Sequence, residues 1–307
     1  MTSMETFTLV PRGPFSLAAS IRFLEGFTPA AYAAGAAETL ELAFPVEGSW
    51  ETAGVRVRQD AAGGVTAEIV SAKAPEAAVR AQVERILSLD VDGTGFPAVG
   101  ERDPVVGDLQ RRYPGLRPVG FWSPYEAGAW TIIGHRIRIT QAAAIKARLA
   151  EQLGEPVSFG RQVVHAFPSP QRLAKLDTFP GLTGRKPEWL RSLALAALDG
   201  ELDTARLRAL PHEEALAEVK KLPGIGDFSA GLILLRGAST PDAIPPQEPR
   251  LARAVALAYG LPEPASPGQL HQISEAWRPY RTWVTLLLRT RLEDETGEIN
   301  GKRLRWG

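Results

Sequence analysis

Apolar and polar residues alternate along two stretches near the start of the chain, at positions 55–57 and 65–69. A period of two is typical of a strand with one buried face, and the glycine-containing segment 59–64 between the stretches indicates a turn. We therefore predict a β-hairpin here, with a further strand over the apolar run 40–46. Pro75 then opens a predicted helix, because the apolar residues after it recur at helical spacing.

Beyond residue 100 the pattern becomes helical, after a Gly/Pro-rich segment, 92–100, that predicts a linker. Ser123, followed by proline and then by glutamate three positions on, is a typical helix start, and we expect that helix to run to Gly134. The other predicted helices cover 140–153, 170–175, 187–198, 212–221, 227–236, 250–259 and 274–291. The pattern favours an α+β chain: an N-terminal antiparallel sheet domain over 1–100, a helical domain over 101–240 and a C-terminal helical subdomain over 241–307.

The charge of the 307-residue chain is balanced, with 35 Lys+Arg against 35 Asp+Glu. Its distribution is uneven, because residues 1–100 carry 7 basic and 12 acidic side chains and the remainder carries 28 basic and 23 acidic. Positive potential over the helical part is compatible with a nucleic-acid partner, whereas the net charge of zero for the whole chain, taken alone, argues against one. The alternative is chance variation of surface charge.

Cysteine is absent from the sequence, which excludes disulfides, thiolate zinc sites and cysteine-ligated iron–sulfur clusters. No apolar run approaches the ~18 residues needed to cross a bilayer, and the N-terminus lacks a signal-peptide pattern. We therefore expect a cytoplasmic protein without membrane contact.

The segment 212–237 carries the strongest local signal for binding. Two amphipathic helices are joined by Leu-Pro-Gly-Ile-Gly at 222–226, in which the proline ends the first helix and the glycines permit close approach of an outside group. The N–H groups at the start of the second helix form a site for a phosphate oxygen. This segment resembles the helix–hairpin–helix DNA-binding motif, and the alternative is an ordinary αα-hairpin with a glycine-rich turn.

Further motifs extend the resemblance over nearly the whole chain. Residues 167–174 (FPSPQRLA) and 277–281 (WRPYR), a carboxylate about twenty residues beyond the hairpin at Glu248, and Gly-Pro-Phe-Ser-Leu at 13–17 occur in the order found in one family. The chain resembles the bacterial AlkA-type 3-methyladenine DNA glycosylase II enzymes of the helix–hairpin–helix superfamily. The resemblance implies a sheet domain followed by an all-α glycosylase core in two helical subdomains.

The same resemblance assigns the catalytic carboxylate to Glu248, where the family usually has aspartate. A carboxylate stabilises the oxocarbenium-like charge that develops on the sugar as the base leaves, and Pro249 places Glu248 at a helix N-terminus, where the dipole favours negative charge. Glutamate is one methylene longer, so three outcomes stay open: an active enzyme with a compensating site, a weaker enzyme, or binding without cleavage. Asp242 is the alternative carboxylate, and both residues could also be solvated loop acids.

The remaining site residues also follow from the resemblance. The hairpin that binds a DNA phosphate comprises Leu222, Gly224, Ile225, Gly226, Phe228 and Ser229. The base pocket is assigned to Phe228, Leu232, Trp283 and Arg289. Leu232 and Arg289 stand in the place of aromatic residues, and Trp283 is a candidate for replacement stacking whose alternative is a core residue. The wedge that fills the gap left by the flipped base is assigned to His135, Arg136 and Ile137, and the alternative for His135 is a surface turn histidine. The backbone carbonyls of Lys220, Leu222 and Ile225 are a candidate site for a structural Na⁺ or K⁺.

The expected activity is that of a bacterial, monofunctional base-excision-repair enzyme that flips alkylated purines of the 3-methyladenine and 7-methylguanine class out of duplex DNA and leaves an abasic site. Phe228 occupies the position at which members with lyase activity carry a Schiff-base lysine, so no lyase activity is expected. We expect no cofactor for catalysis, no iron–sulfur cluster, sequence-independent binding to double-stranded DNA, a monomer and a location at the nucleoid. The alternatives are a non-catalytic or weakly active damaged-DNA-binding protein of the same fold and, less favoured, a helical scaffold.

Overall fold

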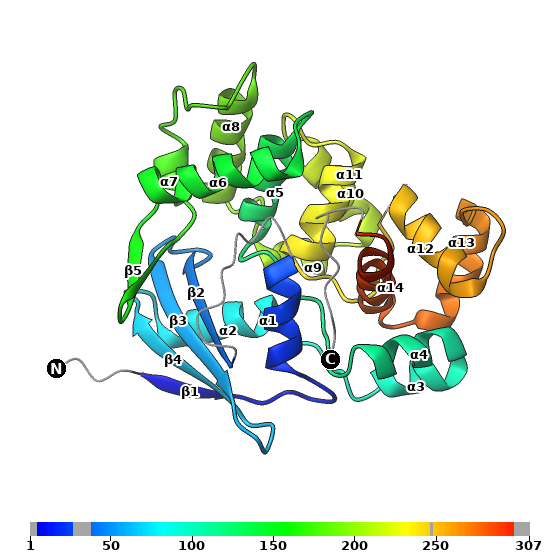
Figure 1. Ribbon diagram of the computed structural model, residues 1–307. Helices are drawn as coiled ribbons and strands as arrows, with labels where there is room; N and C mark the ends of the chain where they lie inside the picture. The colour runs from blue at the N-terminus through cyan, green and yellow to red at the C-terminus, as the bar shows by residue number, and fades with distance from the viewer. Residues whose placement is uncertain (1–4, 27–37, 246–247, 298–307) are drawn as a thin grey trace.

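The computed structural model describes residues 5–26, 38–245 and 248–297, and its N-terminal part is a four-stranded antiparallel sheet in the order β1-β4-β3-β2 (Figure 1). The strands are β1 (Thr6–Leu9), β2 (Thr39–Pro45), β3 (Thr52–Gln59) and β4 (Val65–Ser71). Val57 of β3 lies opposite Leu40 of β2 and Ala67 of β4, so the alternating apolar residues share one face. Helices α1 (Leu17–Gly26) and α2 (Glu76–Ile86) pack their apolar residues against that face. The predicted hairpin and α+β class are confirmed.

A second, smaller sheet covers part of the opposite face, and the sequence analysis did not predict it. Strands β5 (Pro156–Phe159) and β6 (Gln162–His165) form a two-stranded ribbon whose Val157 and Phe159 pack with Ala43 of β2. Gly54 permits this contact, because a Cβ there would lie 2.2 Å from Cγ1 of Val157. The ribbon therefore rests on the backbone of β3.

The middle of the chain folds into a helical cluster around one apolar core. Its first helix begins as predicted, because the Ser123 side chain accepts a hydrogen bond from the Glu126 N–H at 3.1 Å. The helices of this cluster are α5 (Pro124–Gly134), α6 (Ile139–Leu153), α7 (Pro170–Leu173), α8 (Lys186–Leu198), α9 (Thr204–Ala209), α10 (His212–Lys220), α11 (Asp227–Leu232) and the π-helical turn η2 (Ile233–Gly237).

The C-terminal helices form a separate core that includes two helices from before the middle cluster. These elements are α3 (Phe96–Arg102), α4 (Pro104–Arg112), α12 (Pro249–Tyr259), α13 (Pro267–Ser274), the 3-10 turn η3 (Glu275–Trp277) and α14 (Arg281–Thr296). The predicted linker over 92–100 is wrong in part, since α3 begins inside it at Phe96. The predicted helix over 274–291 is also wrong, since the helical conformation is interrupted around Pro279 before α14 begins.

The expected boundary at residue 101 thus does not match the packing. Residues 96–116 belong with the C-terminal helices, and the middle core begins near Phe121. Buried arginines join these parts: Arg85 of α2 donates to the Gly237 carbonyl at 2.6 Å, and Arg117 donates to the carbonyls of Pro14 and Ser88 at 2.8 and 2.9 Å. The Arg85 bond fixes the end of the π-helical turn η2 relative to the sheet domain, and the Arg117 bonds fix the segment before the middle core to the same domain.

Candidate active site and nucleic-acid interface

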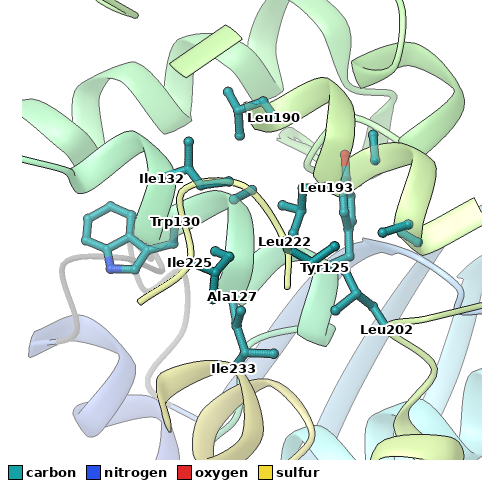
Figure 2. Packing of buried hydrophobic residues seen from close by; sticks show 14 of the residues in the cluster. Tyr125, Ala127, Trp130, Ile132, Leu190, Leu193, Leu202, Leu222, Ile225 and Ile233 are labelled. Carbon is teal, nitrogen blue, oxygen red and sulfur yellow. The ribbon is translucent and has the colours of Figure 1, made fainter. Parts of the chain in front are cut away.

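The hairpin between α10 and α11 is anchored from inside. Leu222 and Ile225 are buried in the middle core, and Figure 2 shows both side chains among Ile132, Leu193 and Ile233. Between and after them, Pro223 and Gly226 are exposed and Gly224 is half-buried. The two buried side chains therefore hold the turn in place, while the backbone at its exposed positions faces outward.

The two glycines of the turn have different physical roles. Gly224 has φ +82°, and a Cβ there would lie 2.6 Å from Cε3 of Trp189. Gly226 is the N-cap of α11 with φ −103°, no side chain caps that helix end, and nothing lies within 4 Å of the position of its Cβ. Gly224 is required by the fold, whereas Gly226 leaves open space at a helix N-terminus that an anion can approach.

Trp189 of α8 connects this hairpin to the predicted wedge. Its ring contacts the His135 ring in an edge-on arrangement at 5.6 Å, and the guanidinium of Arg185 lies 5.8 Å from the Trp189 ring centre. Trp189 was not predicted as a site residue, although a tryptophan three residues after an arginine-lysine pair at a helix start is a visible signal. The hairpin and the wedge are thus parts of one packed unit.

The wedge residues occupy the turn between α5 and α6. Arg136 is exposed with φ +55°, whereas His135 and Ile137 are half-buried. Lys186 donates to the last buried carbonyl of α5, that of Ile133, at 2.9 Å. Burial, and then the charges of Lys186 and Arg136, lower the pKa of His135 from its usual 6.5, so the ring is neutral at pH 7. Of the three, Arg136 is the side chain that the turn presents outward.

The charges beside the hairpin are compensated by its own acids. Lys220 lies 2.5 Å from Asp227, and Lys221 lies 2.5 Å from Glu218. The hairpin's attraction for a phosphate therefore comes chiefly from its backbone. The candidate cation site stays a prediction; of its carbonyls, that of Leu222 also accepts the N–H of Ile225 at 3.1 Å.

The second helix of the hairpin presents one aromatic side chain. Phe228 is 61% exposed, a large value for an apolar ring, and it directly follows the first residue of α11. Ser229 is buried and Leu232 packs partly against the middle core. The side chain of Ser229 is therefore not presented to DNA, and any contact it makes involves its backbone.

Glu248 lies at the N-cap of α12, and its side chain is only 8% exposed. It makes no capping hydrogen bond to its own helix. Instead its Oε1 contacts Nη1 of Arg289, which lies on α14 and keeps 25% of its side chain exposed. The predicted catalytic carboxylate and the arginine predicted in the base pocket are thus partners.

A second guanidinium lies near this pair. Arg236, in the π-helical turn η2, donates to the carbonyl of Val119 at 2.6 Å. Desolvation, and then the charge of Arg289, lower the pKa of Arg236 to about 9, whereas the charge of Glu248 raises it. We call Glu248, Arg289 and Arg236 the charge cluster. Its residues come from the N-cap of α12, from α14 and from the turn η2 that follows α11.

Burial and hydrogen bonding bear on two other predictions. Trp283 is 1% exposed and its ring centre lies 5.1 Å from that of Phe96 in the C-terminal core, which favours the alternative of a core residue over a place in the base pocket. Asp242 accepts hydrogen bonds from Arg281 Nε at 2.8 Å and Arg278 Nη1 at 2.9 Å. That carboxylate fixes the start of α14, and Glu248 remains the candidate for chemistry.

Neither a metal centre nor a membrane span is found in the part of the chain that the structure describes. Its His, Asp and Glu residues form no group of three that could hold a metal ion. Within the same residues, no helix is long and apolar enough to cross a membrane.

An outward-facing helix–hairpin–helix, a buried carboxylate at a helix N-terminus beyond it, and a small antiparallel sheet packed on the helical body together define the fold of the helix–hairpin–helix DNA glycosylases. Among solved structures, a 3-methyladenine DNA-glycosylase from Archaeoglobus fulgidus has a TM-score of 0.76 at 19% identity, covering 95% of this chain and 99% of that one. An 8-oxoguanine glycosylase/lyase of Clostridium acetobutylicum in complex with double-stranded DNA has a TM-score of 0.61 at 18% identity, covering 82% and 87%.

Sequence relatives narrow the assignment within that fold. DNA-3-methyladenine glycosylase of Bacillus subtilis (strain 168) is 25% identical over 204 residues, and DNA-3-methyladenine glycosylase 2 of Escherichia coli (strain K12) is 30% identical over 187 residues. The matches cover 65% and 59% of this chain and 67% and 62% of the relatives, about two thirds of each at most. No family model matches the chain. The chain is thus similar in sequence to DNA-3-methyladenine glycosylases and shares the fold of one of them.

Proposed function

We propose that this protein is a monofunctional DNA glycosylase that hydrolyses the bond between deoxyribose and a damaged, above all alkylated, purine in duplex DNA. The observation that carries the proposal is the position of Glu248, an almost buried carboxylate at the N-terminus of α12 beside the end of the hairpin unit. The names of the sequence relatives support the same reaction class.

The reaction requires a negative group next to the sugar. As the bond from C1′ to the base nitrogen breaks, its electron pair leaves with the base and positive charge develops on the sugar. Glu248 stabilises that charge and accepts a proton from the attacking water, whose oxygen bonds to C1′. Its low exposure strengthens the interaction, because little water screens it.

Water is the nucleophile in this proposal. A glycosylase that also cuts the strand needs an amine to form a Schiff base with the sugar, and Phe228 stands where such a lysine is placed in that class. The product is an abasic site in an intact strand. The 8-oxoguanine glycosylase/lyase of Clostridium acetobutylicum has the same fold, so the absence of lyase activity needs its own test.

The DNA contacts in the proposal are independent of sequence. The backbone around Gly226 binds one phosphate, Phe228 stacks on the extruded base, and Arg136 enters the space that the base leaves. We propose that the protein works as a monomer at the nucleoid.

The first experiment compares base release by the wild type, Glu248→Gln and Glu263→Gln on a duplex with one alkylated purine. Glu248→Gln removes the charge with little change of shape, so release should fall on the order of 10²-fold or more. The control carboxylate at Glu263 is exposed, and its loss should leave the rate unchanged. Equal rates for all three proteins would remove Glu248 from the mechanism. Borohydride treatment should trap no covalent protein–DNA adduct, and a trapped adduct would overturn the monofunctional assignment.

One observation favours a second function. The contact with Arg289 compensates the charge of Glu248, which leaves less negative potential to stabilise the positive charge that cleavage develops on the sugar and therefore favours binding without cleavage. Tight binding to an abasic-site duplex, with no base released from any damaged duplex, would establish that function in place of the first.

A further inference from the structure

The charge cluster holds the partly exposed guanidinium of Arg289 directly against the carboxylate of Glu248, and in the proposed function this carboxylate acts at the sugar that carries the leaving base. Arg289 contacts Glu248 through Nη1, and its side chain retains 25% exposure, so a ligand can reach it. Its Nε is buried without an acceptor among the residues that the structure describes. The guanidinium therefore still has donor capacity beyond its contact with Glu248.

Positive charge at this point is unfavourable for a cationic base. An N3- or N7-alkylated purine carries a positive charge while it is attached to the sugar and departs as a neutral molecule. Arg289 repels such a base before cleavage, and it compensates the carboxylate that would otherwise attract it. Arg236 adds positive potential from the hairpin side, and the charge of Arg289 contributes to the lowered pKa of Arg236.

The same guanidinium is favourable for a neutral base. A neutral purine receives the electron pair of the broken bond and departs as an anion that later takes up a proton. A guanidinium N–H that donates to a ring nitrogen or carbonyl oxygen of that base stabilises the developing negative charge, and hydrogen bonds to charged groups are the stronger ones. Arg289 thus stabilises a charge that a cationic base never develops.

We propose that Arg289 is a specificity-determining residue that shifts base excision from cationic N-alkylpurines toward neutral damaged purines, such as 1,N6-ethenoadenine and hypoxanthine, that leave as anions. The inference rests on the proposed glycosylase function and refines its substrate class. In the reaction the oxygen of water bonds to C1′, the bond from C1′ to N9 breaks, and its electron pair goes to the base. The proton lost by water passes to Glu248, and the departing anion is reprotonated from solvent.

The test measures single-turnover base release from matched duplexes that contain 1,N6-ethenoadenine, hypoxanthine or 7-methylguanine. The proteins are the wild type, Arg289→Gln, Arg289→Lys and the control Arg291→Gln, which alters an arginine on the same helix that bonds to Glu295. Wild type should release the neutral bases faster than 7-methylguanine. Arg289→Gln should slow the neutral bases on the order of 10²-fold and speed 7-methylguanine, because it frees the carboxylate.

Opposite changes of two rates in one variant separate this role from a structural one, since a misfolded variant loses both. Arg289→Lys keeps the charge and should retain the wild-type order of substrates, and the control should retain both rates. An unchanged ratio of neutral to cationic release in Arg289→Gln would overturn the inference and leave the glycosylase function standing. No release of any base by the wild type would overturn both.

Discussion

Gly224→Ala should destabilise the protein through the hairpin. The new Cβ would lie 2.6 Å from Cε3 and 2.7 Å from Cδ2 of Trp189, well inside van der Waals contact. The φ of +82° adds backbone strain of about 1–2 kcal/mol for a residue with a side chain. Overpacking of this kind costs about 1–3 kcal/mol, so the free energy of unfolding should fall by about 2–5 kcal/mol.

Gly226→Ala is the matched control two residues further on. It has φ −103° and no atom within 4 Å of the added Cβ, so its stability should stay within about 1 kcal/mol of wild type. The Cβ would nevertheless project into the space that the phosphate is expected to occupy. Affinity for duplex DNA should therefore fall alike for all sequences.

Urea unfolding and fluorescence anisotropy with a labelled duplex measure the two effects separately. Hydrogen exchange at the amides of the hairpin would locate the damage in Gly224→Ala, since an opened turn exchanges faster. A Gly224→Ala protein as stable as wild type would refute the packing argument. Unchanged DNA affinity in Gly226→Ala would refute the role of the hairpin in binding.

Three further predictions concern the edges of the site. Asp242→Asn weakens the bonds that fix the start of α14, so the free energy of unfolding measured in urea should fall by about 1–3 kcal/mol. The control Asp108→Asn alters an exposed ion pair and should lower it by less than about 0.5 kcal/mol, and equal losses in the two variants would contradict the prediction. The pKa of His135 is lowered in the folded state, so its contribution to stability is fully present above pH 6.5 and is lost as pH falls through the folded pKa. The melting temperature should therefore fall with pH in this range, and His135→Gln should make that fall less steep. An equally steep fall in the variant would exclude His135 as its source. Phe228→Ala should leave stability nearly unchanged, because the ring is 61% exposed, but should weaken duplex binding about 10-fold. Leu257→Ala removes another exposed apolar side chain and should leave duplex binding unchanged. Equal affinities of the two variants would exclude stacking by Phe228.

The ion pair between Glu248 and Arg289 raises the question of how a compensated carboxylate takes part in glycosylase chemistry. The resemblance leads one to expect the shorter aspartate at Glu248 and an aromatic residue at Arg289, and the structure shows that the two side chains present here contact each other. A glutamate that lacked such a partner would be an almost buried charge without compensation, which is costly. The two substitutions are therefore best understood together, as a site whose electrostatics have been changed as a unit.

The sequence by itself determined the features that depend on short-range interactions. The cap at Ser123, the strands and turn over 52–71, and the hairpin at 222–226 each follow from backbone angles, local hydrogen bonds or the period of apolar residues. Each of these elements depends on residues that lie close together in the sequence, so tertiary packing leaves its local conformation as predicted. The helical spacing of apolar residues over 274–291 does not reveal the break before α14, which Pro279 marks.

The tertiary structure alone decided which distant residues meet. Glu248 and Arg289 lie 41 positions apart, and Trp189 connects a turn before it in the sequence with a hairpin after it. Helices α3 and α4 join the C-terminal core across the whole middle cluster. Such contacts depend on the packing of many side chains at once, and no local period or spacing encodes them. The chemistry of this site, a carboxylate paired with a guanidinium, could therefore be found only in the folded protein.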